Sequence, residues 1–166
     1  MIPLNNNIRK TLSPPIAEAF NWLENIKIPK KLKLLNLSQA APMHPPPTDI
    51  RQAIANASLN YKKAHIYGPI LGNNDLRKEF SKKWNKIYDA KINMSNIGIT
   101  SGSNQAFCAT LASLASPGDN IIITSPWYFN HKMWLDMSSI KSKIMPLNNE
   151  MLPEPKKAEK LIDKKT

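Results

Sequence analysis

The sequence is poor in cysteine, in glycine and in long apolar runs. Its single cysteine, Cys108, cannot form an intrachain disulfide, so the fold does not depend on an oxidising compartment. No run of about 18 apolar residues occurs, and no apolar segment follows the first charged residues, which argues against a membrane-spanning helix and a secretory signal. We therefore expect a cytoplasmic protein without a membrane partner.

Acidic residues are also few. The chain has 12 Asp and Glu against 23 Lys and Arg, a formal net charge of +11, which raises the question of a nucleic-acid partner. Most basic residues are lysines in short groups, such as Lys30-Lys31 and Lys82-Lys83, and no arginine-rich stripe with interleaved aromatics occurs. A solvated surface explains this pattern better than a nucleic-acid interface, so nucleic acid is the less favoured partner.

Periodicity predicts mainly helices in the first half of the chain. One helix is expected before Lys27, a second from Thr48 to about Leu59, and a third from Asn74 or Asp75. The second and third have one apolar face each, which we expect to be buried. A short apolar strand is predicted at 33–38, ahead of the proline run at 45–47.

The second half has the alternation of an α/β protein. Apolar runs predict strands, and runs of small residues or amphipathic runs predict helices. Gly, Pro and Ser mark the turns between them. The expected elements are a strand at 97–100, a turn at 101–103, a helix at 104–115, a strand at 121–123, a helix from Asn130 or His131, a strand at 143–147 and a helix near 158–163. Strand–helix–strand units of this kind indicate a parallel sheet.

The segment Ile99 to Phe107 can bind an anion at the start of its helix. The first amides of a helix have no intrahelical partner, and the helix dipole adds partial positive charge. Gly102 lets the backbone approach a ligand closely, and Ser103 offers a hydroxyl. An ordinary turn in which Ser103 caps the helix would have the same residues, so both interpretations stay open.

A second candidate site follows the strand that ends at Pro126. Trp127, Tyr128 and Phe129 come directly after this proline, and His131 lies close behind. Ligands bind at strand ends in α/β proteins, where a flat aromatic ring can stack on a planar heterocycle. A hydrophobic corner with a satisfied histidine is the alternative.

Four sequence elements, in the order in which they follow one another, resemble motifs of the class I and II aminotransferases of fold type I. They are Tyr67–Gly72 followed by Leu76-Arg77, the Ser101–Ser103 turn, the Pro117–Asp119 turn, and the Pro126–Phe129 strand end. The resemblance runs from about Asn36 to the end of the chain. It implies an N-terminal helical arm at 1–35 and, at 36–166, an incomplete cofactor-binding large domain with three layers, α/β/α.

The resemblance also implies pyridoxal 5'-phosphate as cofactor. Gly102, Ser103 and Asn104 would hold its phosphate. Tyr128 would stack on the pyridine ring. His131 would support the aspartate that pairs with the pyridine nitrogen.

Further implications concern the substrate and a partner subunit. Tyr67 matches a tyrosine that reaches the partner's phosphate across a homodimer interface. Ala40 or Ala41 falls where many relatives use a glycine amide for the substrate carboxylate. The activity implied is amino-group transfer from an amino acid to a 2-oxo acid.

The segment that carries the catalytic lysine in this family has no counterpart in the sequence. We therefore expect a truncated or split-gene aminotransferase that is inactive alone. Two alternatives stay open: a non-catalytic module that binds phosphate or the cofactor, and a basic protein that binds nucleic acid or another partner.

Overall fold

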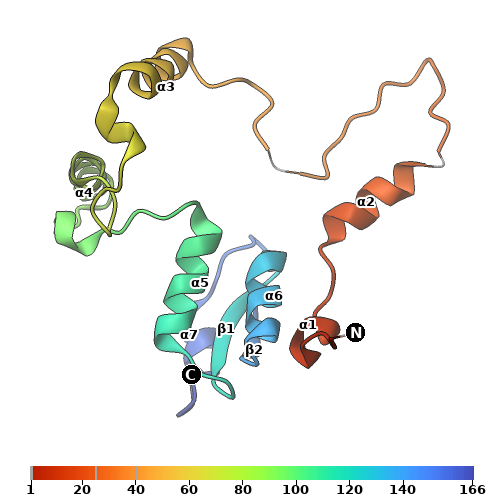
Figure 1. The fold of residues 1–166 in the computed structure, drawn as a ribbon. Helices are drawn as coiled ribbons and strands as arrows, with labels where there is room; N and C mark the ends of the chain where they lie inside the picture. Colours follow the sequence, from red (N-terminus) through yellow and green to blue (C-terminus); the bar gives the residue numbers. More distant parts are fainter. Residues whose placement is uncertain (1, 25, 40) are drawn as a thin grey trace. The chain divides into compact units, whose positions relative to one another are not determined.

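A computed structural model describes residues 2–24, 26–39 and 41–166. The chain forms helices up to α5 at Ser103–Leu114, and two strands then alternate with the last helices (Figure 1). In order they are α1 Asn6–Lys10, α2 Pro15–Glu24, α3 Thr48–Asn60, the 3-10 helix η1 Lys62–His65, α4 Asn74–Tyr88, the 3-10 helix η2 Met94–Asn96, α5 Ser103–Leu114, β1 Asn120–Ser125, α6 Phe129–Met137, β2 Lys141–Pro146 and α7 Pro155–Glu159.

The chain divides into two compact units. The first comprises Met1–Gln39 together with Ser103–Thr166, and the second comprises Ala40–Gly102. Within the first unit, hydrogen bonds connect the N-terminal helix α1 to the end of α6. Asn7 Nδ2 donates to Ser139 Oγ at 2.7 Å and to Met137 O at 3.3 Å. The predicted boundary near residue 35, between an arm and a cofactor-binding domain, stays a prediction.

A strand–helix–strand element forms the centre of the first unit. β1 and β2 pair in parallel, from Asn120 opposite Lys141 to Ser125 opposite Pro146. Parallel neighbours need a crossover connection, and α6 provides it. The β-branched run Ile121–Ile123 suits the centre of such a strand. The predicted α/β pattern of this region is therefore confirmed.

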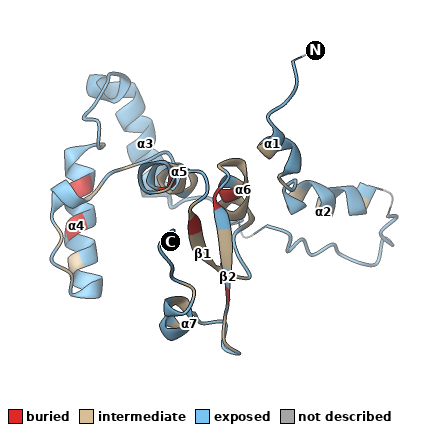
Figure 2. Ribbon diagram, turned by 90° about the horizontal axis from the view of Figure 1, so that it is seen from below, coloured by how far each residue is buried: buried red, intermediate tan, exposed pale blue. Residues whose placement is uncertain are grey.

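Apolar side chains from α5, α6 and β1 meet on one face of the two strands. Leu135 of α6 has no exposed surface, and it packs with Leu111 of α5 and with Ile140. Ile121 and Ile123 of β1 are packed against the same cluster. In the described part of the chain the buried apolar residues are Leu111 in α5, Leu135 in α6, Ile140 just before β2 and Met145 in β2, whereas α3 is exposed along its whole length (Figure 2).

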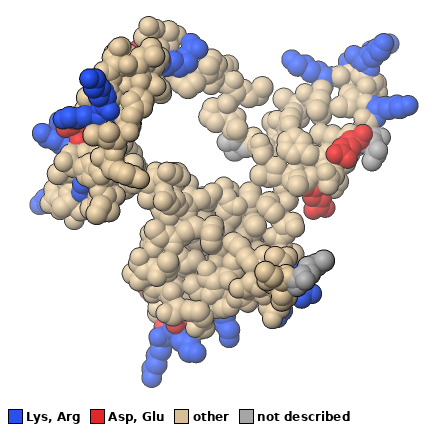
Figure 3. Space-filling model, viewed as in Figure 1, with Lys and Arg blue, Asp and Glu red and all other residues tan. Residues whose placement is uncertain are grey.

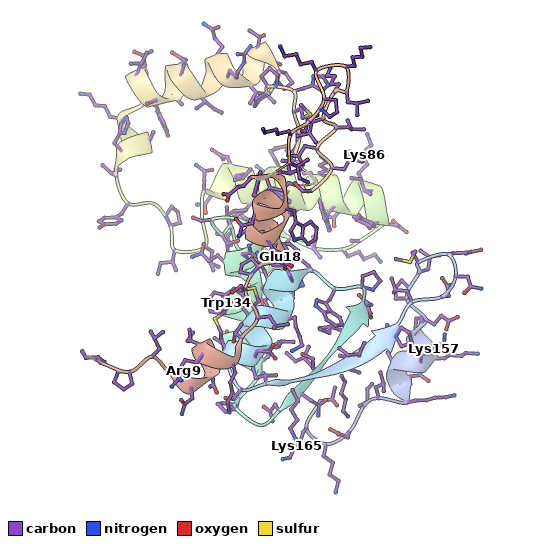
Figure 4. All side chains as sticks on the ribbon, turned by 90° about the vertical axis from the view of Figure 1, so that its right-hand side faces the viewer. Arg9, Glu18, Lys86, Trp134, Lys157 and Lys165 are labelled. Carbon is purple, nitrogen blue, oxygen red and sulfur yellow. The ribbon has the colours of Figure 1, made fainter. Side chains whose placement is uncertain are left out.

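The segment that follows α7 is bonded to the first residue of β1. Side chains alternate along a strand, so Asn120 points away from the core that Ile121 contacts. Asn120 Nδ2 donates to Asp163 Oδ1 at 3.0 Å, and its main-chain N–H donates to Lys165 O at 2.8 Å. The Lys165 side chain itself extends into solvent (Figure 4). Helices α5 and α6 thus pack on one face of the strands, and the segment after α7 is bonded to Asn120 of β1 and Lys143 of β2 from the other side.

Asp163 is the centre of the polar network that holds this segment. Lys143 Nζ donates to Asp163 Oδ2 at 2.7 Å, and Thr166 Oγ1 donates to Asn120 Oδ1 at 2.7 Å. The hydrogen bond from Lys143, followed by those from Asn120 and the Lys165 amide, holds the pKa of Asp163 well below its ordinary value of 3.8. The carboxylate is therefore stabilised in its charged form.

This depressed pKa predicts an acid-sensitive contact. A carboxylate with a lowered folded-state pKa stabilises the fold fully above its ordinary pKa, and this contribution declines as the pH falls below about 3.8. We expect the main chain at Thr166 to become more mobile below that pH, and Asp163→Asn to make it mobile at neutral pH as well. Backbone ¹⁵N relaxation at Thr166 measures this. Asp89→Asn is the control, and an Asp163→Asn spectrum with the native pH dependence would contradict the assignment.

The second unit is organised by a buried arginine. Arg77 of α4 is only 6% exposed, and its guanidinium donates from Nε to Ile97 O at 2.7 Å and from an Nη to Met94 O at 2.8 Å. These bonds fix the loop that contains η2 against α4. Asn73 caps α4, since its Oδ1 accepts from the Asp75 and Leu76 amides. The Leu-Arg pair of the sequence pattern therefore has a structural role here.

Three sequence-based expectations are wrong. The segments 33–38 and 97–100 form no strand among the described residues, since neither has a paired neighbour; Ile99 N donates singly to Leu71 O. The last helix is α7, which ends at Glu159, because Asp163 is held in the polar network. The apolar faces of α3 and α4 are not buried: α3 has no buried residue, and α4 buries only Arg77 and Ser81.

Within the described ranges, no helix is both long and apolar enough to cross a membrane.

Candidate cofactor site

The turn before α5 has the conformation that its glycine allows. Gly102 has a φ of +86°, in the left-handed region that favours glycine. Its N–H donates to Thr100 O at 2.8 Å, and Thr100 Oγ1 donates to Gly102 O at 2.9 Å. Two bonds thus fix the backbone immediately before the first residue of α5. The sequence pattern located this turn correctly.

The start of α5 is suited to an anion. Its first turn contains no acidic residue, and Ser103 at the first position is exposed. A β-carbon at Gly102 would have no neighbouring atom within 4 Å, so the space beside this backbone is open. Asn104 Oδ1 is buried and has no hydrogen-bond partner in the described part of the chain. Because amide oxygen and nitrogen can be exchanged by rotation, this side chain can also present a donor.

The residues after β1 form an aromatic corner, which we define as Tyr128, Phe129 and His131. The ring centroids of Tyr128 and His131 are 5.2 Å apart and the rings are nearly perpendicular, at 85°. Phe129 lies beside Tyr128, with 5.0 Å between the centroids. Asn130 Nδ2 donates to the Tyr128 hydroxyl at 2.9 Å, which restricts the tyrosine ring. The two predicted site residues, Tyr128 and His131, are therefore in contact.

Trp127 lines a groove of about 450 Å³ together with Leu12 and Pro15 of the N-terminal segment, Phe129 and Met133. Of the three consecutive aromatics, only Tyr128 and Phe129 belong to the aromatic corner. Tyr128 does not line this groove, whereas Phe129 borders both the groove and the aromatic corner.

Phe107 connects the corner with α5, and sequence reasoning did not identify it. Its ring is stacked on the His131 imidazole, with centroids 4.0 Å apart and planes inclined by 15°. Phe107 lies one helical turn beyond Ser103, so the same helix carries the anion-binding end and the ring that contacts His131. In the sequence, only its spacing of four residues from Ser103 indicated that Phe107 lies near the anion-binding end of the helix.

The remaining predicted residues belong to the second unit. Tyr67 follows η1 and is fully exposed, at 105% of its reference surface. Ala41 is exposed in the loop before Pro42. Ala40 lies outside the described residues. Their proposed contacts with a partner subunit and with substrate stay predictions.

These residues fit pyridoxal phosphate. The α5 terminus offers main-chain donors and no negative charge to the phosphate, and Tyr128 offers a ring that is partly exposed. His131 offers ring nitrogens that can bond to a carboxylate. The three features lie at the start of α5, directly before α6 and on α6, all in one compact unit.

On the face shown in Figure 3, Lys and Arg stand in several separate groups. Lysines of α4 and of α6 are also paired with carboxylates, as in Lys82–Glu79 and Lys132–Asp136. Such pairs within one helix are typical of a solvated surface, and the expectation that nucleic acid is the less favoured partner stays a prediction.

Comparisons with known proteins identify the family of the chain. Residues 33–166 match the sequence pattern of the family "Aminotransferase class I and II". The chain is 30% identical over 166 residues to the human tyrosine aminotransferase, covering 95% of this chain and 35% of that protein. It is 28% identical over 132 residues to a probable aspartate aminotransferase of Methanocaldococcus jannaschii, covering 80% of this chain and 35% of that protein.

A solved structure shows the same fold. The alanine aminotransferase from Pyrococcus furiosus superposes with a TM-score of 0.82 at 20% identity, over 99% of this chain and 42% of the other. The chain thus spans about a third of the length of the curated relatives, and its fold is part of the fold type I α/β architecture. The family depends in general on pyridoxal phosphate. The chain belongs to the class I and II aminotransferase family.

Proposed function

We propose that this chain forms the cofactor-binding part of an enzyme that transfers an amino group from an amino acid to a 2-oxo acid. The observation that carries the proposal is that the α5 terminus and the aromatic corner belong to one unit and are joined by the Phe107–His131 stack. Bound pyridoxal phosphate would supply the electron-accepting chemistry of amino-group transfer. The residues described above would hold and orient it.

In this proposal the α5 terminus binds the phosphate. The main-chain N–H groups of Ser103 and Asn104 donate to phosphate oxygens, and the Ser103 hydroxyl adds a further donor. Gly102 fixes the direction of these groups through its left-handed conformation. No acidic side chain in the first turn opposes the negative charge.

The aromatic corner holds the cofactor ring. Tyr128 stacks on it, and its hydroxyl bond with Asn130 keeps the tyrosine ring from rotating away. His131 donates a hydrogen bond to a carboxylate that pairs with the ring nitrogen, and so keeps that carboxylate in place. In this proposal Tyr128, Asn130 and His131 hold the cofactor ring, and none of them moves a proton of the substrate.

We propose that the enzyme to which this chain belongs works as a homodimer in the cytoplasm. Support for a partner comes from the exposed apolar residues around Tyr67: Ile66 and Ile70 are also exposed, and clusters of this kind mark interaction surfaces. The backbone at Ala40 or Ala41 would face the substrate carboxylate. The expectation that the chain is inactive alone stays a prediction.

A pair of substitutions tests the role of Tyr128. Tyr128→Ala removes the proposed stacking ring, which is worth about 0.5–1.5 kcal/mol, so we expect it to weaken pyridoxal phosphate binding by up to about tenfold. Binding of inorganic phosphate should not change, because its site is at α5. Isothermal titration measures both affinities.

Trp127→Ala is the matched control. Trp127 lines the groove beside Leu12 and Pro15, so its loss should leave both affinities unchanged. If Trp127→Ala weakens cofactor binding more than Tyr128→Ala does, the assignment of the stacking residue is wrong.

A further inference from the structure

The orientation of the His131 imidazole is set by rings and not by hydrogen bonds. Neither ring nitrogen of His131 has a hydrogen-bond partner among the residues that the structure describes, although its main-chain N–H donates to Tyr128 O at 3.0 Å. His65 differs, because its Nε2 lies 2.7 Å from Ser58 O. The plane of the His131 ring therefore depends on its aromatic neighbours.

Of the two aromatic neighbours of His131, Phe107 is the one that packs against the hydrophobic core. It lies in the middle of α5 and packs against the buried cluster of Leu111, Leu135 and Ile140. A ring held by a close-packed core has little freedom to rotate. It covers one face of the imidazole almost in parallel, at 4.0 Å and 15°.

Tyr128 adds a second, perpendicular contact. Its ring is inclined by 85° to the imidazole, at a centroid distance of 5.2 Å. Because both neighbours contact His131 through rings, neither occupies the ring nitrogens. A polar side chain at position 107 could compete for them, whereas phenylalanine has no hydrogen-bonding group.

We propose that Phe107 is a positioning residue for His131. It fixes the imidazole plane through the stack and leaves both ring nitrogens available for a partner that the bound cofactor brings into place. The stack itself is a property of this chain; only the purpose of the available nitrogens rests on the proposed function. Phe107 acts through His131 and does not touch the cofactor.

The experiment is an NMR measurement of the imidazole signals of the 166-residue chain. The sequence has three histidines, so His131→Gln identifies the signals of His131 by their loss. Protons that lie over an aromatic face are shifted upfield. We expect the His131 ring protons to be displaced upfield from those of His44 and His65.

Substitutions at position 107 then show whether the upfield displacement of the His131 signals needs an aromatic ring or only an apolar side chain. Phe107→Leu keeps an apolar side chain but has no ring, so the upfield displacement should disappear. Phe107→Tyr keeps the ring and should restore it. Phe80→Leu, which removes a ring that pairs with Trp84, should leave the His131 signals unchanged.

The methyl signals of Leu111 and Leu135 show whether each variant keeps the core. A folded Phe107→Leu chain with native His131 signals would overturn the proposal. If Phe107→Leu does not fold, the Phe107→Tyr chain decides, and loss of the displacement in a folded Phe107→Tyr chain would overturn it equally. Addition of pyridoxal phosphate is a separate arm: unchanged His131 signals there would count against the proposed function but not against the stack.

Discussion

Replacement of Gly102 by valine is expected to lower the affinity of the chain for pyridoxal phosphate about a hundredfold. Gly102 has a φ of +86°, a conformation that a β-branched residue rarely adopts. Valine should therefore change the backbone dihedral angles of the turn. The amides at the start of α5 would then no longer converge on the phosphate. Loss of two hydrogen bonds to a charged group costs about 3 kcal/mol, which corresponds to this factor. Isothermal titration with pyridoxal phosphate and with inorganic phosphate measures the change.

Gly118→Val is the control for strain alone. Gly118 has a φ of +96°, and a β-carbon there would also have no neighbour within 4 Å. Both substitutions therefore impose a similar backbone cost, but Gly118 lies in the turn before β1 and away from the α5 terminus. Equal losses of affinity in the two variants would remove the phosphate-binding role from the Gly102 turn.

Leu135→Ala should destabilise the first unit by about 3 kcal/mol in free energy of unfolding. Leu135 has no exposed surface and contacts the cluster that joins α5, α6 and β1. Its truncation removes apolar contacts and leaves a cavity that a close-packed core fills only in part. Urea denaturation followed by circular dichroism gives the change from the shift of the midpoint.

The matched control is Leu114→Ala. Leu114 is also a helical leucine, in the last turn of α5, but it is 80% exposed. Its truncation should change the free energy of unfolding by no more than about 0.5 kcal/mol. Similar losses in both variants would mean that the core is not centred on Leu135.

Local patterns predicted the elements whose signals lie within a few residues. The helix from Thr48 follows apolar spacing, the helix from Asn74 follows apolar spacing and the capping residue Asn73, and β1 follows the run Ile121–Ile123. The turn at Gly102 is equally local, because a glycine between a polar run and a helix start has few alternatives. These are properties of short segments, so the sequence alone was sufficient.

Strands and contacts across the chain required more than local pattern. The apolar segments 33–38 and 97–100 have strand-like composition, but a strand exists only beside a partner, and composition does not supply one. The helix predicted near 158–163 was overridden by Asp163, whose bonds to Asn120 and Lys143 reach residues about 40 and 20 positions away. The Phe107–His131 stack similarly joins two helices.

The titration of the ¹⁵N-labelled chain with pyridoxal phosphate, followed by NMR, tests the central claim most directly. We expect the amides of Ser103 and Asn104 and the ring signals of Tyr128 and His131 to shift together along one saturation curve. Inorganic phosphate should shift the two amides and leave both rings unchanged. Shifts scattered over the lysines, with Ser103 and Asn104 unaffected, would contradict the assignment of the cofactor site to α5 and the aromatic corner.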